Sequence, residues 1–141
     1  TVSIQSIIIS GTAGTLVSVP CTLVRRASAD TGGTAATTTA NWANNISKLD
    51  TNSPAASATL ISYSANPTIV DSAPTYVASR IITFPVTTAG VAIVPSIFEF
   101  GNNFLSQPLI LRGIAQQICL NLNAVSVSSG LLHLTIEWIE Y

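Results

Sequence analysis

The segment Leu132-His-Leu-Thr-Ile-Glu-Trp138 decides the fold, because apolar and polar side chains alternate along its whole length. Successive side chains of an extended chain point to opposite faces, so a period of two is typical of a half-buried β-strand. One face carries Leu132, Leu134, Ile136 and Trp138, and the other carries His133, Thr135 and Glu137. The segment therefore predicts a strand that lays one side on a hydrophobic core.

The same alternation recurs along the chain. In residues 16–24 the inward set is Val17, Val19, Cys21 and Leu23, and in residues 116–122 it is Ile118, Leu120 and Leu122. Further strand candidates are residues 3–10, 58–65, 76–88, 92–100 and 108–112. Glycine, asparagine and proline separate most of these segments and predict turns. Pro85 and Pro95 lie inside candidates and mark an edge, a bulge or a break, because proline cannot donate to a ladder.

Composition and length favour one all-β domain over residues 1–141. Ile, Val and Thr supply 44 of the 141 residues, and their branched side chains suit a pleated surface better than a helix. About eight short strands predict an antiparallel β-sandwich with jelly-roll-like topology. An immunoglobulin-like sandwich is the alternative, although Trp42, between the two cysteines, lies in a polar stretch.

Charged residues are scarce: Asp, Glu, Lys and Arg make up 8% of the chain, where about 25% is usual. The 48% apolar content argues against disorder. Four arginines and one lysine neutralise few phosphates, so no nucleic acid partner is expected. No apolar run approaches the roughly 20 residues of a membrane span, so no membrane partner is expected. A chain without Met that starts at Thr1 is expected to have lost an initiator Met after cytoplasmic synthesis; a trimmed signal peptide is the alternative.

Residues 27–57 form one long stretch rich in Thr, Ala and Ser. A loop of that length is uncommon inside a compact domain. It is either a solvated insertion or an arm that orders against a neighbouring subunit, with Trp42 as its anchor. Arg25 and Arg26, just before it, are either a solvated strand end or a docking contact for an acidic neighbour.

Few residues suit catalysis or metal binding. His133 is the only histidine, and Glu137 lies four residues along the same strand face, about 13 Å away, so the two cannot share a metal ion. Glu99 and Glu137 would form a glycosidase pair only if their strands were neighbours. We therefore expect no enzyme, no metal and no cofactor.

The cysteines predict no disulfide, because Cys21 and Cys119 fall on opposite faces of their strands. Cys119 is expected on a covered outer face. Arg112 follows an apolar run and is expected to be a half-buried partner for Glu99 or Glu137.

Several strand candidates carry apolar side chains on both faces: Ile7 to Ile9, Ile81 and Ile82, Leu109 to Leu111, Leu131 and Leu132, and Trp138 and Ile139. A sandwich strand normally buries one face, so a second apolar face needs a cover from another chain. A net charge of −1 also gives little repulsion between copies. The pattern predicts an obligate oligomer or a component of a larger assembly.

Five phrases carry a resemblance to a known family. They are Pro20-Cys-Thr-Leu-Val-Arg-Arg26, Ala58-Thr-Leu-Ile-Ser-Tyr-Ser-Ala-Asn-Pro67, Leu109-Ile-Leu-Arg-Gly-Ile-Ala-Gln-Gln117, Cys119-Leu-Asn-Leu-Asn123 and Ser129-Gly-Leu-Leu-His-Leu-Thr-Ile-Glu-Trp138. From about residue 16 to the end, the chain resembles small structural proteins encoded among the virion genes of tailed bacteriophages. The resemblance implies a β-sandwich that decorates or cements a capsid, often as a trimer, without catalytic residues.

The leading hypothesis is a capsid decoration or cement protein on the virion surface, made in the host cytoplasm and bound to the major capsid protein or another virion protein. The N-terminal strand is expected to add to a neighbour's sheet edge. Residues expected to bind the partner are Val2, Ile4, Arg25, Arg26, Trp42, Trp138 and Tyr141. Alternatives are a receptor- or carbohydrate-binding spike or tail module using Trp42 and Tyr63, and the capsid subunit of a small virus.

Overall fold

The computed structural model describes residues 1–35, 46–87, 90, 92–101 and 107–141, which form nine strands and no helix. The strands are β1 (Val2–Thr12), β2 (Val17–Arg26), β3 (Thr34–Ala35), β4 (Tyr63–Ala65), β5 (Thr75–Phe84), β6 (Ser96–Glu99), β7 (Leu109–Leu111), β8 (Gln117–Asn121) and β9 (Leu131–Glu140). No helix in this part of the chain is long and apolar enough to span a membrane.

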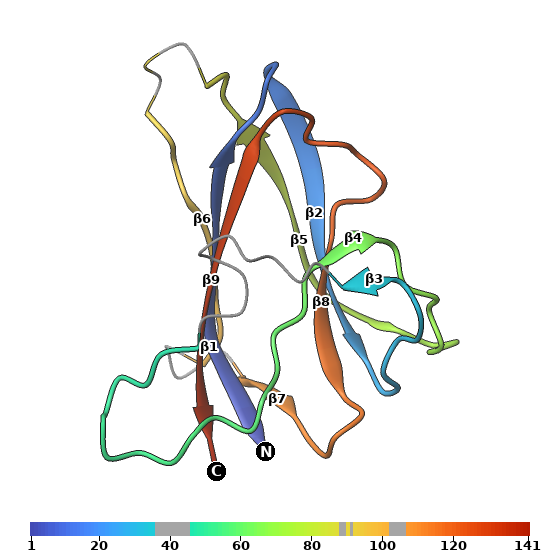
Figure 1. Ribbon diagram of the computed structural model, residues 1–141, viewed down its shortest axis with the longest axis vertical. Coiled ribbons are helices and arrows are strands. Elements are labelled where there is room, and N and C mark those ends of the chain that lie inside the picture. Colours follow the sequence, from blue (N-terminus) through green and yellow to red (C-terminus); the bar gives the residue numbers. More distant parts are fainter. Residues whose placement is uncertain (36–45, 88–89, 91, 102–106) are drawn as a thin grey trace.

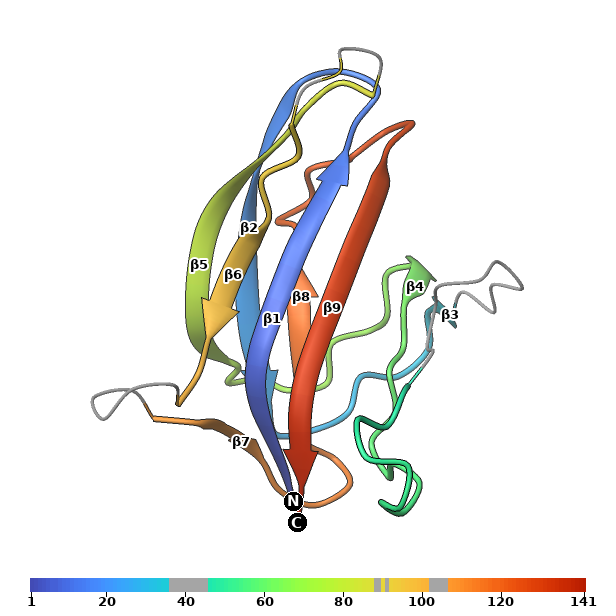
Figure 2. The same cartoon turned by 90° about the vertical axis from the view of Figure 1, so that its left-hand side faces the viewer.

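Seven of the strands form two antiparallel sheets that face each other (Figures 1 and 2). In the first sheet β9 pairs with one side of β1, while β6 and β7 pair with different stretches of its other side. In the second sheet β2 lies between β5 and β8. The predicted all-β antiparallel sandwich is confirmed, and its jelly-roll-like topology stays a prediction.

The first and last strands bring the chain ends together. Ten residues of β1 pair with β9, from Val2 opposite Glu140 to Thr12 opposite Leu131. The backbone N–H of Tyr141 donates to the carbonyl oxygen of Thr1 at 3.0 Å, and Figure 1 shows the two termini side by side.

A bulge in β1 explains why its apolar residues do not keep one parity. Ile7 and Ile9 lie in the core at 1% and 0% exposure, and Ile4, of opposite parity, is 4% exposed. The register with β9 shifts between Ile4 and Ser6, which leaves Gln5 as the extra residue. Because a one-residue slip turns every later side chain to the other face, the bulge lets both halves of β1 face one core.

The core lies between the two sheets and is mainly aliphatic. Its buried members are Ile4, Ile7, Ile9, Ala13, Val19, Cys21, Leu23, Ile82, Phe84, Phe98 and Leu109. The inward sets predicted for β2, β8 and β9 contact this core, apart from Leu132, which is 38% exposed. The alternation therefore predicted the inward faces correctly.

Two sequence predictions need correction or refinement. The predicted strand over residues 58–65 is wrong for its first five residues; only Tyr63–Ala65 is a strand, because β3 offers a two-residue partner. Pro85 directly follows β5 and Pro95 directly precedes β6, so both prolines mark strand breaks. Of the predicted loop over residues 27–57, the stretch around Trp42 lies outside the described residues.

The insertion between β2 and β5 is fastened to the end of β9 by one carboxylate. Glu140 Oε2 accepts from Ser57 Oγ at 2.5 Å and Ser57 N at 2.9 Å, while Oε1 accepts from Trp138 Nε1 at 3.0 Å and Ala58 N at 3.1 Å. The hydroxyl of Ser57 and the indole of Trp138 are the largest causes that lower the pKa of Glu140 to about 2, with the two amides adding to them.

We expect acid to weaken this anchor. Because the pKa of Glu140 lies below its ordinary value of 4.5, the ionised carboxylate stabilises the fold fully above about pH 4.5 and progressively less as the pH falls towards 2. Urea midpoints of the wild type and the Glu140→Gln variant should differ most at pH 6, less at pH 3, and converge only near pH 2. A Glu99→Gln variant, altered at an exposed carboxylate of β6, is the control; an equal Glu140→Gln deficit at all three pH values would contradict the prediction.

Candidate interaction surfaces

The described residues expose sixteen large apolar side chains by 38% or more. Several sit beside core residues on the same strand: Ile81 is 75% exposed next to Ile82 at 4%, and Ile139 is 47% exposed next to Trp138, which packs on the core. The prediction of apolar side chains on both strand faces is confirmed.

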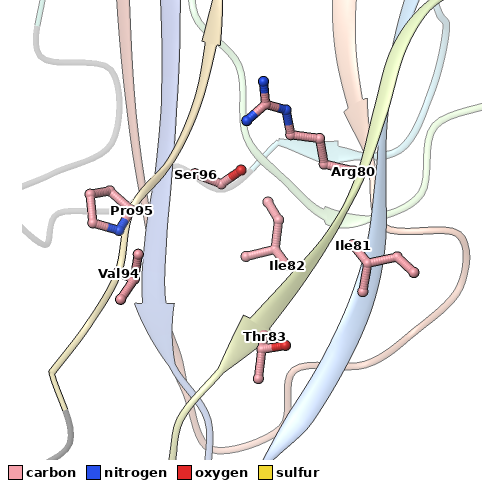
Figure 3. A pocket seen from close by; sticks show the side chains of 7 residues that line it. All are labelled: Arg80, Ile81, Ile82, Thr83, Val94, Pro95 and Ser96. Carbon is pink, nitrogen blue, oxygen red and sulfur yellow. The ribbon is translucent and has the colours of Figure 1, made fainter.

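A groove lies between β5 and the residues that lead into β6 (Figure 3). Its volume is about 330 Å³, and its walls are Arg80, Ile81, Ile82, Thr83, Val94, Pro95 and Ser96. Figure 3 shows Ile82 pointing towards the Val94–Ser96 wall. These walls contain one guanidinium, two hydroxyls and aliphatic groups, so they supply no general base or carboxylate.

Arg80 closes one end of this groove. It pairs in register with Cys21, so it has inward parity on an edge strand. Its Cζ lies 5.0 Å from the centroid of the Phe98 ring on the opposite sheet, a cation–π contact. Sequence analysis missed this contact, although Arg80 shares the parity of Ile82 and Phe84 within the predicted strand over residues 76–88.

Glu99 and Glu137 lie on strands that are not neighbours, because β6 and β9 pair with opposite sides of β1. Both pair in register with Ser6, Glu99 from β6 and Glu137 from β9. Their backbones are therefore two strand spacings apart, about 9.5 Å. Ser6 Oγ donates to Glu137 Oε2 at 2.9 Å, and both glutamates are exposed. The side chain of Ser6 thus lies between the two glutamates on their shared face of the sheet.

Arg112 does not serve as the predicted half-buried partner of either glutamate. Its side chain is exposed, and its backbone N–H donates to Gln116 Oε1 at 2.6 Å. A short turn after β7 therefore places it at the surface.

Arg26 is buried, which corrects its expected role as a docking residue. Its side chain is 8% exposed and forms an ion pair with Asp30, whose side chain is 2% exposed. The guanidinium is engaged by its own chain, because residues just after β2 fold back onto the outer face of the second sheet. Arg25 is exposed and stays a candidate.

The same cover explains Cys119. Its side chain is half-buried and burial raises the pKa of the thiol; among the smaller effects, the charge of Arg26 lowers it and the charge of Asp30 raises it. The predicted covered face is confirmed, and part of its cover comes from this chain. Cys21 is buried in the core and both cysteines are free, so the prediction of no disulfide is also confirmed.

The N-terminal strand cannot add to a neighbour's sheet edge, because β1 is paired on both sides. Ile4 is buried in the core and Val2 packs against it, so neither offers a partner a free side chain. Trp138 is half-buried and also packs on the core, whereas Tyr141 is 81% exposed. Of the expected partner-binding residues, the structure therefore leaves Arg25 and Tyr141 clearly accessible.

The buried ion pair should make Asp30 important for stability. Arg26 Nε and Asp30 Oδ1 have no hydrogen-bond partner, so the pair is only partly satisfied. Removal of Asp30 alone leaves a buried charge uncompensated, and Asp30→Ala should lower the free energy of unfolding by about 3–5 kcal/mol in urea titrations. The double variant Arg26→Met/Asp30→Ala should lose less free energy of unfolding than Asp30→Ala, because it no longer buries an unpaired cation.

Glu99→Ala, at an exposed carboxylate, is the control and should stay within about 0.5 kcal/mol of the wild type. A double variant less stable than Asp30→Ala would show that the two residues do not act as a pair.

Within the described residues, no three His, Cys, Asp or Glu side chains gather closely enough to hold a metal ion. The chain matches no known protein-family model, no curated protein and no solved structure.

Proposed function

We propose that the chain is a non-enzymatic structural protein of a virion, a capsid decoration or cement protein that binds the major capsid protein as a homo-oligomer and stabilises the shell. The observation that carries the proposal is the exposed apolar surface on strands whose other face already fills the core. The virion setting is supported by the five phrases that resemble tailed-phage structural proteins.

The mechanism is burial of apolar area across seams of the shell. Each 100 Å² of apolar surface removed from water contributes about 2.5 kcal/mol before the costs of association. A protein that binds only the assembled shell stabilises it by mass action. The apolar side chains that a partner would cover in this region are Ile81, 75% exposed on the outer face of β5, and Val94, 76% exposed at the wall of the groove.

The test compares particles stripped of the protein with particles to which it has been added back. Added protein should raise the temperature at which heat releases the packaged DNA. The Ile81→Asn variant should bind several-fold more weakly, because it removes exposed apolar surface without disturbing the core. Thr75→Asn, an exposed polar change at the start of the same strand, is the matched control and should bind as the wild type does. Identical release temperatures with and without saturating protein would rule out the cementing role.

A further inference from the structure

The edge strands of the two sheets are not equally protected. Natural edges avoid pairing with other chains by being short, bulged, or furnished with lysine or proline. β6, β7 and β8 have four, three and five residues, and β5 has Arg80 and a register shift opposite Leu23 and Val24. β9 runs for ten residues with no Lys, Arg, Pro or Gly. β9 is therefore a long edge strand without these protective features.

Within the described residues β9 pairs with β1 alone, so its far edge has no partner strand, and only at its last residue does Glu140 hold Ser57 and Ala58 of the insertion. Its apolar side chains are also unusually open for a strand: Leu131 is 65% exposed, Ile139 47% and Leu132 38%. A regular apolar edge of this length presents a template for another strand.

The side chains of β9 are complementary to themselves when two copies run antiparallel. Trp138, Ile136 and Leu134 face the core, so the outer face carries the alternate residues Leu131, His133, Thr135, Glu137 and Ile139. A two-fold axis at Thr135 places Leu131 opposite the second copy's Ile139, His133 opposite its Glu137, and Thr135 opposite itself. A Leu–Ile pair buries apolar surface, an imidazole N–H can donate to a carboxylate, and Thr–Thr pairs favour antiparallel neighbours.

Neighbouring registers lose this match. With the axis at Leu134, Leu131 meets Glu137, and with the axis at Ile136, His133 meets Ile139. On the inner face, the axis at Thr135 also pairs apolar residues: Leu134 lies opposite the second copy's Ile136, and Leu132 lies opposite its Trp138. The contact of Ser6 with Glu137 does not exclude the imidazole, since a carboxylate accepts several hydrogen bonds.

We propose that β9 pairs with β9 of a second copy about a two-fold axis at Thr135, which joins the two four-stranded sheets into one continuous sheet. The occupant of this edge is thus another copy of the chain. A two-fold pairing builds dimers, not the trimer that the family resemblance implies. The β9-paired dimer does not depend on the capsid role. If the chain does bind a capsid, this dimer is the unit that binds.

The axis makes a cross-linking test possible. A residue on the axis faces its own copy with Cβ atoms about 4.5–5.5 Å apart, close to disulfide range. The Thr135→Cys variant of the full chain should therefore oxidise mostly to a covalent dimer on non-reducing gels. Wild type, with its two native cysteines, and Ser79→Cys, on the exposed edge strand β5, are the controls and should stay uncross-linked.

A charge swap tests the register in solution. In sedimentation equilibrium the wild type should be a dimer, and His133→Glu should weaken it about tenfold, because two like-charge pairs form. His133→Glu/Glu137→His should restore the wild-type dissociation constant, since the swap again sets each glutamate opposite a histidine. Circular dichroism of each variant checks that the sandwich is intact.

Several outcomes would overturn the proposal: a monomer at all concentrations, cross-linking no faster than Ser79→Cys, or a double variant no tighter than His133→Glu. The result is separable from the capsid role. A monomer that still protects particles would overturn the dimer alone, and a β9 dimer that does not bind particles would overturn the capsid role alone.

Discussion

The pairing of β1 with β9 is the constraint on which the sandwich depends. It joins Val2 to Glu140, so one ladder closes a loop over nearly the whole chain. β6 and β7 attach to the other side of β1, and the first sheet is therefore incomplete until the last strand is in place. A fold built on such distant contacts is expected to form more slowly than one built on local contacts.

This pairing also decides where the molecule can be extended. β1 has hydrogen-bonded neighbours on both sides and offers nothing to a partner, although it is the most continuous apolar strand near the N-terminus. The unpaired edge of the first sheet is therefore β9. Exposed apolar side chains lie on the outer faces of the strands and beside the groove between β5 and β6. A low charge content leaves these surfaces without electrostatic protection.

The insertion between β2 and β5 acts as a strap more than as a free loop. At its start, Asp30 engages Arg26 on the second sheet, and at Ser57 it is held by Glu140 on the first. Figures 1 and 2 place β3 and β4 on the side of the sandwich away from β5 and β6. The strap thus ties the two sheets together with polar contacts where the apolar core ends.

The sequence by itself predicted most of the strands, the inward faces of β2, β8 and most of β9, the two-sheet class and the apolar character of both strand faces. All of these follow from side-chain period and composition, which are local properties. Only the tertiary structure decided that β1 is central and β9 an edge, that Gln5 is a bulge, that Arg26 is buried, and that Glu99 and Glu137 flank Ser6. Alternation with a period of two predicts to which face of the sheet a side chain points. It does not predict which strands are neighbours, because that depends on pairing between residues far apart in the chain.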